Sequence, residues 1–343
     1  NSANNFGVRI ADSGNGSGKI IATGDSSLTV TGIGGLGSGG NHSGVYVYGA
    51  SIAGGTTGLV SVTGTGGVST GPNNYGVYVA STNATITSSG GDVTVTGQGG
   101  GTGASANNHG VYLLGGGGIT AGGSGEVHVD GTGGSSTGND NWGVNLVHTD
   151  SQITSSDGDI TVTGRGGGSE TSANNLGVRI VDAGNGPGKI IATGDSSLTV
   201  TGIGGSGSGG YHFGIHVSGA SIVGGTTGLV SVTGTGGVST GPNNHGVYVA
   251  STNATITSSG GDVTVAGQGG GSGISSTNRG IAVHNGAVIS AGGAGSVSVT
   301  GTGGTSTGNS NVGVLIADAN SQITSAGGNI AVTATGGGAD ASS

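Results

Sequence analysis

Three acidic residues, Asp92, Glu126 and Asp159, each open a short β-like stretch, at intervals of 34 and 33 residues. If these stretches stack as neighbouring strands, the carboxylates lie roughly 5 and 10 Å apart. That range includes the carboxylate pairs of glycosidases, and it also suits Ca²⁺ held by carboxylates and carbonyls. The equivalent positions later in the chain include Ser296 and Asn329, so the trio does not recur there. Solvated carboxylates at a turn are the simplest interpretation, and we predict no enzyme, no metal and no cofactor.

Aromatic residues are few, and they all lie within a few residues of the glycine in a G-V-x-V motif. Seven of the eight histidines share that window. The main members of the expected stripe are Phe6, Tyr46, Tyr75, Tyr78, Tyr112, Trp142, Phe213 and Tyr248. Aromatic-rich surfaces bind protein partners and sugars, whereas stacked rings also stabilise a fold without any ligand. Both interpretations stay open, as does a lateral contact between neighbouring rods.

Threonines form a second regular series in the V-T-V-T-G segments. The outward array comprises Thr31, Thr63, Thr96, Thr163, Thr201, Thr233, Thr300 and Thr333. A T-x-T array of this kind resembles the ice-binding face of hyperactive antifreeze proteins, in which ranked hydroxyls order water. Threonine is equally a common solvent-facing strand residue, and His128 and Asp130 interrupt the array. Ice binding is therefore an alternative interpretation.

These residues recur because the whole chain repeats. Residues 2–171 return as residues 172–341 without a gap, and the segment from Val77 to Val95 returns unchanged. Each of these two 170-residue super-repeats contains five units that average 34 residues, so the chain has ten units. Self-similarity at such a period is the signature of a repeat architecture.

Each unit contains three stretches in which apolar and polar residues alternate, as expected of strands with one buried face. The first is G-V-x-V, the second is centred on an isoleucine, and the third is V-T-V-T-G. The predicted core isoleucine column is Ile21, Ile52, Ile86, Ile119, Ile153, Ile191, Ile222, Ile256, Ile289 and Ile323. So few aliphatic positions per unit cannot form a core alone, but stacked units can.

The repeat predicts an all-β fold, a parallel β-solenoid (β-helix) of ten coils with about 34 residues and three strands per coil. Residues 1–343 then form one solenoid domain, with five coils in each super-repeat. Ten coils give a rod about 50 Å long. Right-handed coiling is favoured for parallel strands joined by crossovers.

Two further columns support stacking. An asparagine two residues before the motif glycine is expected to form a hydrogen-bonded ladder between coils. Its members are Asn5, Asn74, Asn108, Asn141, Asn175, Asn244, Asn278 and Asn311, with His42 and His212 at the same place in the other two units. A glycine pair follows every third stretch, for example Gly99 and Gly100, which indicates positive φ or a close backbone approach at a corner.

Composition narrows the function further. Glycine contributes 89 of 343 residues, cysteine is absent and the formal net charge is −9 with six scattered Lys and Arg residues. That balance argues against a nucleic-acid partner, and no apolar run approaches the ~20 residues of a membrane span. The chain begins with Asn, so we interpret it as a segment excised from a longer protein.

The alternation of V-T-V-T-G-x-G-G with N-N-x-G-V-x-V resembles the repeat regions of giant bacterial exoproteins, similar to filamentous haemagglutinin-like adhesins. The resemblance covers the whole chain in repeat style. It implies a secreted, bacterial, surface-exposed β-helical shaft that takes part in cell attachment or in an extracellular fibre. It implies no catalytic residue.

Neither end of the sequence carries an obvious cap, so we expect terminal coils that pair end to end. The predicted function is a non-enzymatic structural subunit or shaft segment of an extracellular or cell-surface fibre or adhesin. Its expected partners are other copies of itself, end to end or side by side, and glycans or other cell-surface molecules. Ice binding and a glycan-binding or glycan-cleaving β-helix are the alternatives.

Overall fold

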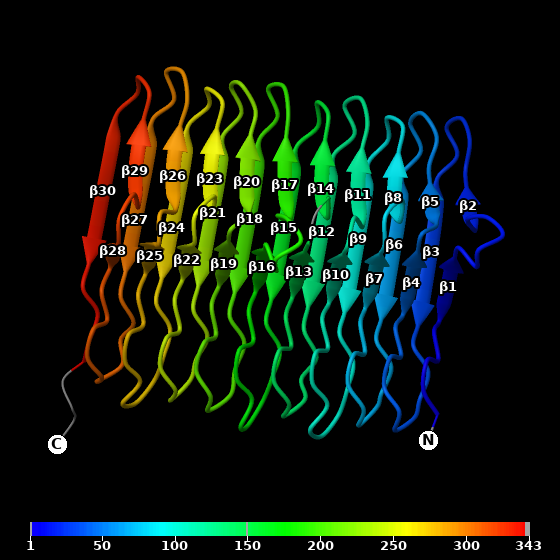
Figure 1. The fold of residues 1–343 in the computed structure, drawn as a ribbon, viewed down its shortest axis with the longest axis horizontal. Coiled ribbons are helices and arrows are strands. Elements are labelled where there is room, and N and C mark those ends of the chain that lie inside the picture. The colour runs from blue at the N-terminus through cyan, green and yellow to red at the C-terminus, as the bar shows by residue number, and fades with distance from the viewer. Residues whose placement is uncertain (1, 149, 340–343) are drawn as a thin grey trace.

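A computed structural model describes residues 2–148 and 150–339, and every regular element in those ranges is a strand (Figure 1). Thirty strands wind into ten coils of three, which confirms the predicted all-β parallel solenoid. Coil 1 contains β1 to β3, and each later coil contains the next three strands, up to β28 to β30 in coil 10. The end of the second super-repeat, from residue 340, lies outside the described residues.

Three parallel ten-stranded sheets run along the rod, and each takes one strand from every coil. Sheet 1 consists of β1 (Val8–Ala11), β4 (Val45–Tyr48), β7 (Val77–Ala80), β10 (Val111–Leu114), β13 (Val144–Val147), β16 (Val178–Val181), β19 (Ile215–Ser218), β22 (Val247–Ala250), β25 (Ile281–His284) and β28 (Val314–Ile316). Sheet 2 consists of β2 (Lys19–Ile21), β5 (Ser51–Ala53), β8 (Thr85–Ser88), β11 (Gly118–Ala121), β14 (Gln152–Ser155), β17 (Lys189–Ala192), β20 (Ser221–Gly224), β23 (Thr255–Ser258), β26 (Val288–Ala291) and β29 (Gln322–Ser325). Sheet 3 consists of β3 (Leu28–Ile33), β6 (Val60–Thr65), β9 (Val93–Gln98), β12 (Val127–Thr132), β15 (Ile160–Arg165), β18 (Leu198–Ile203), β21 (Val230–Thr235), β24 (Val263–Gln268), β27 (Val297–Thr302) and β30 (Ile330–Thr335).

The pairing register places like residues above like. Val111 of β10 pairs with Val77 of β7 on one side and with Val144 of β13 on the other. Side chains alternate along each strand, so one set of aliphatic residues points inward from all three sheets and forms a single continuous core. Each coil contributes too few apolar side chains to fold alone, and its core is completed by the coils above and below.

The isoleucine column differs from the prediction in two coils. Ile20, not Ile21, pairs with Ile52, and Ile190, not Ile191, pairs with Ile153 and Ile222. The prediction was wrong at Ile21 and Ile191 because two isoleucines follow one another there and alternation allows only one to face the core. Ile21 is 56% exposed, whereas Ile190 is fully buried.

The invariant glycine pairs are explained by close packing of the backbone. Neither Gly99 nor Gly100 has a positive φ. A Cβ on Gly99 would lie 2.2 Å from the carbonyl oxygen of Asn108, and one on Gly100 would lie 2.3 Å from that of Gly67. No side chain fits in such a gap, so glycine is required at this corner for space.

Candidate functional site

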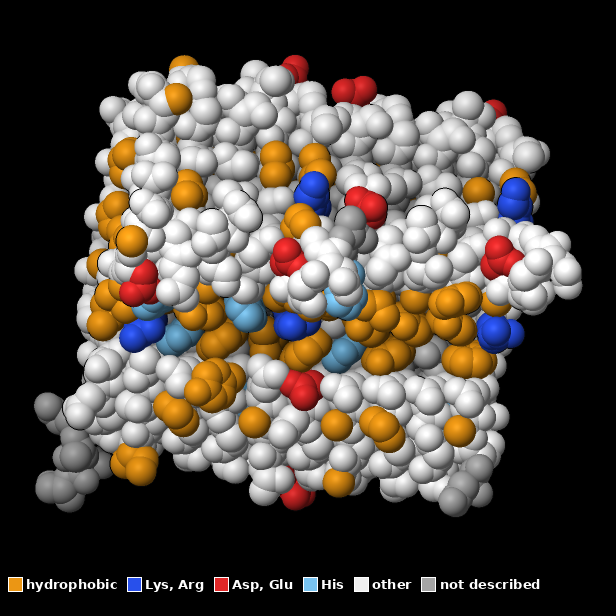
Figure 2. Space-filling view, viewed as in Figure 1, with side chains coloured by type: hydrophobic (Ala, Val, Ile, Leu, Met, Phe, Trp, Pro, Cys, Tyr) orange, Lys and Arg blue, Asp and Glu red, His pale blue; other side chains and the backbone are white. Residues whose placement is uncertain are grey.

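Aromatic and basic side chains gather in a band along sheet 1, which we call the lateral stripe (Figure 2). The stripe has two columns. The flank column is the residue just before each motif glycine, namely Phe6, Ser43, Tyr75, His109, Trp142, Leu176, Phe213, His245, Arg279 and Val312. The strand column is the second residue of each sheet 1 strand and points outward, namely Arg9, Tyr46, Tyr78, Tyr112, Asn145, Arg179, His216, Tyr248, Ala282 and Leu315.

In coils 2 to 4 the strand column is a stack of tyrosine rings, and Phe6 of the flank column extends it into coil 1. Phe6 stacks on Tyr46, and Tyr46, Tyr78 and Tyr112 stack in turn, each neighbouring pair having ring centroids 5.0 Å apart. Tyr75 from the flank column contacts both Tyr78 and Tyr112. Burial raises the pKa of Tyr75 and of Tyr78, because the phenolate form loses its hydration. This half of the stripe is covered by its own rings.

A three-layer stack closes that region at coil 5. The Trp142 ring lies parallel to the His109 ring at 4.5 Å on one side, and the Arg179 guanidinium lies 4.4 Å from the Trp142 ring centroid. The Trp142 Nε1 donates a hydrogen bond of 2.6 Å to the carbonyl oxygen of Asn174. Cation–π contact and a satisfied indole N–H together hold Trp142 in one orientation.

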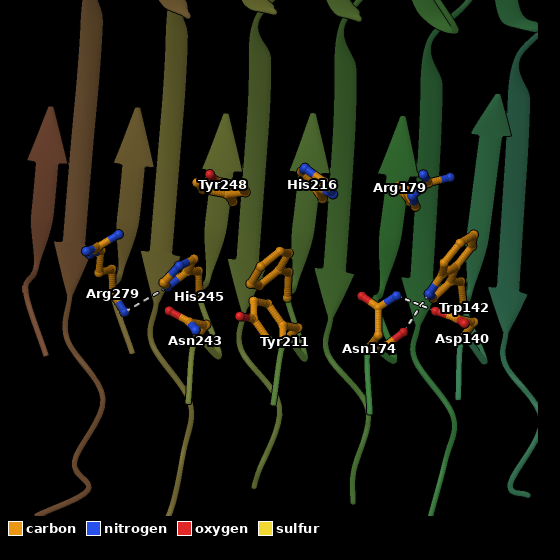
Figure 3. Close-up of a pocket in the computed structure, with 11 residues that line it drawn as sticks. Asp140, Trp142, Asn174, Arg179, Tyr211, His216, Asn243, His245, Tyr248 and Arg279 are labelled. Atoms are coloured by element: carbon orange, nitrogen blue, oxygen red, sulfur yellow. Dashed lines mark hydrogen bonds between the residues drawn. The ribbon is translucent and has the colours of Figure 1, made fainter. Parts of the chain in front are cut away.

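Leu176 interrupts the flank column in coil 6, between Trp142 and Phe213. Its short side chain is buried, so no ring spans the distance between those two aromatic residues. A surface hollow of about 540 Å³ opens in this part of the stripe, lined by residues of coils 5 to 9 that include Trp142, Arg179, Tyr211, Phe213, His216 and Arg279 (Figure 3). Figure 3 shows Tyr211 on one side of the opening and Asn174 with Trp142 on the other.

The ring of Phe213 is fixed by its neighbours on the far side of the hollow. It stacks on His245 at 5.0 Å, and His216 and Tyr211 meet it edge-on. Burial lowers the pKa of His216 and that of His245 to about 3 each, and nearby Arg179 and Arg279 respectively add to the effect. Both rings are therefore neutral at pH 7.

One rim of the hollow comes from a column in which the backbone has a positive φ. That column, three residues before each motif glycine, is Asn4, Asn41, Asn73, Asn107, Asp140, Asn174, Tyr211, Asn243, Thr277 and Ser310, with φ between 57° and 67°. Asparagine and aspartate tolerate this conformation better than other residues with a Cβ. This explains why the first residue of the N-N-x-G motif is usually asparagine. Asp140, Asn174, Tyr211 and Asn243 line the hollow, and Asn174 Nδ2 donates to Asp140 Oδ1.

Two of the six basic residues of the chain line the hollow. Arg179 Nη1 donates to Asn145 Oδ1 at 3.1 Å, while Arg279 Nη1 lies 3.3 Å from His284 Nε2. Arg279 Nε is buried and has no hydrogen-bond partner among the described residues. A guanidinium carries five N–H donors, so both arginines have donors left for a ligand.

The asparagine column lies in the corner before sheet 1 and forms hydrogen bonds from coil to coil. Asn74 Nδ2 donates to Asn108 Oδ1 at 2.9 Å, and Asn108 Nδ2 donates to Asn141 Oδ1 at 2.9 Å. Asn244, Asn278 and Asn311 repeat this pattern in the second half. Asn5 and Asn175 instead donate their backbone N–H to the Nδ1 of His42 and His212. Apart from the partly exposed Asn5, these asparagines are buried, so the ladder stabilises the corner rather than binding a ligand.

The outward threonines lie in register on sheet 3. Thr31, Thr63 and Thr96 pair on successive strands, and Thr163, Thr201 and Thr233 do so further along. Asp130 and Ala266 interrupt the column, and Thr300 and Thr333 continue it to the last coil.

The acidic trio is used in the backbone ladder. Asp92 Oδ1 accepts a hydrogen bond from the N–H of Glu126 at 2.9 Å, and Asp159 Oδ1 accepts one from Ser197 at 2.8 Å. Glu126 lies 3.2 Å from His128 Nε2. Among the described residues, no group of three or more His, Cys, Asp or Glu side chains has the geometry of a metal site. No helix able to cross a membrane occurs in the same part of the chain.

No protein-family model, curated protein or solved structure matches the chain. The sequence predicts Trp142, Phe213 and Tyr248 as members of the stripe, but it does not predict the hollow or assign Arg179, Arg279 and Tyr211 to it. A signal was present in the sequence, because Leu176 stands where the first super-repeat has Phe6 and Tyr211 stands where it has Asn41.

Proposed function

We propose that this chain is a rigid, non-enzymatic shaft segment of an extracellular or cell-surface fibre or adhesin. One observation supports the proposal above all, namely that three parallel sheets continue through all ten coils without a break in register. A ladder of this kind joins every coil to the next by backbone hydrogen bonds in three sheets at once. Stiffness then follows from the backbone, in a chain with only 31% hydrophobic residues.

The exposed strand of coil 10 suits continuation of the rod. β30 is exposed along its length, and the side chains of Ile330 and Val332 are 48% and 49% exposed. They belong to the column that in coil 9 contains the buried Val297 and Val299. A further coil, from the same polypeptide or from another molecule, would bury them and complete the sheet edge.

Electron microscopy with fibre diffraction tests the proposal. We expect the chain to form unbranched filaments with an axial repeat of about 4.8 Å. Replacing Ile330 and Val332 together by lysine puts two charges in the end-to-end contact and should abolish the filaments. Lysines at Ala331 and Thr333, which point outward on the same strand, are the matched control and should leave them intact. Dispersed particles under all conditions, or filaments unaffected by the inward lysines, would refute end-to-end assembly.

The in-register threonine column of sheet 3 supports ice binding as a second candidate. Thr163 and Thr201 are adjacent members of one uninterrupted segment of that column. Thr163→Tyr or Thr201→Tyr would break the flat hydroxyl array without altering the core. Thermal hysteresis in the wild type that either substitution abolishes would favour this function over the shaft.

A further inference from the structure

We infer that the hollow between Trp142 and Phe213 binds an acidic oligosaccharide, that is, a short chain of sugars bearing carboxylate groups. The inference concerns the side of the rod and uses no property of its ends. It therefore stands or fails separately from the proposed shaft function.

The shape of the hollow fits a ligand of this size. Its volume is about 540 Å³, within the range of small-molecule sites in proteins. It crosses several coils, so its long direction follows the rod and accommodates a linear chain better than a compact ligand. The walls are held in place, because Trp142 is clamped by Arg179 and His109 and Phe213 is clamped by His245.

Tyr211 supplies an aromatic surface that the fold itself does not require. Its side chain is 51% exposed, and its φ is 67°, a conformation that disfavours bulky residues. The equivalent residue is asparagine in the coil before it (Asn174) and in the coil after it (Asn243). A strained, exposed aromatic residue at the rim of a hollow indicates a binding role, and the apolar face of a sugar ring packs well on such a ring.

The charges select an acidic sugar over a neutral one. The chain has a net charge of −9, yet the hollow contains two arginines and a single carboxylate, that of Asp140. Within the described residues, Arg179 Nη1 donates to Asn145 and Arg279 Nη1 lies beside His284 Nε2, which leaves further Nη N–H donors on each guanidinium. Guanidinium groups with free N–H donors match the geometry of a carboxylate. Asp140, which already accepts from Asn174, remains able to accept a sugar hydroxyl.

Isothermal titration calorimetry on the whole chain tests the inference with three probes: tetrasaccharides of galacturonate, of mannuronate and of hyaluronan. Each probe is paired with its methyl ester, which keeps the sugar rings and removes the charge. We expect at least one acid to bind, with its ester at least tenfold weaker, and we expect binding to weaken as salt is raised. Failure of all three acids to bind, or equal affinity for acid and ester, would overturn the inference.

Variants taken from the chain's own repeats locate the site. Leu176→Phe introduces the residue found at Phe6 and should fill the hollow, abolishing binding. Tyr211→Asn restores the residue type of Asn41 and should weaken binding at least tenfold, with no loss of thermal stability. Arg279→His, which copies His109, should lower the preference for acid over ester.

The reverse exchange, Phe6→Leu, is the matched control. It makes the opposite change in side-chain size at the equivalent position of coil 1, far from the hollow, and we expect binding to be unchanged. If Phe6→Leu weakened binding as much as Tyr211→Asn does, or if Leu176→Phe left binding intact, the acid would bind elsewhere and the inference would be wrong.

Discussion

Coils 1 to 5 and coils 6 to 10 share their inward-facing residues almost completely and differ on the lateral stripe. Val77 to Val95 and its copy, Val247 to Val265, are identical in sequence, and Ile86 and Ile256 are fully buried at equivalent places. On the stripe, by contrast, Tyr46 corresponds to His216 and Phe6 to Leu176. Coils 1 to 4 cover their part of the stripe with stacked rings, whereas a hollow opens from coil 5 into coils 6 to 9 and takes both of its arginines from the second half. The backbone ladder sets the fold, and outward side chains change without altering it.

Core substitutions test whether the two halves have the same core packing, and we expect them to cause the largest loss of stability. Ile86→Ala and Ile256→Ala should each destabilise the protein by about 2–5 kcal/mol, because each removes a fully buried side chain from the same column. The two losses should be equal within error. Hydrogen exchange of the amides in β8 and β23 measures them separately, which matters because a long repeat array need not unfold in one step. Unequal losses would show that the halves differ inside as well as outside.

Acidification should weaken the second half more than the first, because among the described residues burial lowers the pKa of three histidines in the second half but of one in the first half, His109, where it falls to about 3. The pKa of His212 is lowered to about 4 by burial, and those of His216 and His245 to about 3, so the folded form stays neutral when unfolded histidine, with a pKa near 6.5, gains a proton. Stability is complete above pH 6.5 and is lost as the pH falls below it. Between pH 7 and pH 5 the loss is about 2 kcal/mol for each such histidine.

The contribution of His216 and His245 to this pH dependence can be tested by replacing them with the tyrosines found at the equivalent positions of the first half. His216 faces Arg179, and His245 faces Arg279, His284 and His216. Replacing both with tyrosine, as at Tyr46 and Tyr75, should remove about half or more of the extra loss, measured by thermal unfolding at pH 7 and pH 5. An unchanged pH profile would mean that other groups control acid sensitivity.

The columns could be predicted because each is repeated ten times in the sequence. Isoleucine at one position of every unit, or asparagine at another, identifies a shared structural place even without knowledge of the fold. The prediction was wrong in the two coils that have two consecutive isoleucines, Ile20–Ile21 and Ile190–Ile191. There the repeat pattern does not determine which of the two faces the core. There the loops before the second strand are longer, and only the observed pairing shows which isoleucine faces inward.

The hollow could not be predicted in the same way, because it arises from a departure from repetition. It is lined by Trp142 from coil 5, by Arg179 from coil 6, which contacts Trp142, and by Arg279 from coil 9. These residues come from different coils and meet only in space. The positive φ of Tyr211 could not be predicted either, because tyrosine rarely adopts this conformation. It is known only from the structure, in which Tyr211 occupies the position that asparagine has in most other coils.

Tyrosine deletion on the stripe should distinguish the two halves by a smaller amount. Tyr78 lies between the parallel rings of Tyr46 and Tyr112, which is a favoured stacking geometry. Its equivalent Tyr248 meets four rings, but each of these contacts is tilted; the four residues are Phe213, His216, His245 and His284. Tyr78→Ala should therefore cost about 1 kcal/mol more than Tyr248→Ala, the contribution of an aromatic pair. Thermal unfolding of the two variants measures the difference. Equal losses would indicate that ring stacking adds nothing beyond buried area.

The smallest effect concerns the backbone at the rim. Tyr211→Asn should raise stability by up to about 1 kcal/mol, because asparagine accepts a positive φ more readily, and Asn41→Tyr should lower it by a similar amount. The edge-on contact of Tyr211 with Phe213, at 6.1 Å, reduces the gain in the first variant but has no counterpart in the second, where Ser43 occupies the flank column. Differential scanning calorimetry of both variants gives the signs. A stabilised Tyr211→Asn that also loses ligand means that the tyrosine is kept at a cost in stability, as expected of a binding residue. A destabilised one means that Tyr211 is held there by packing alone.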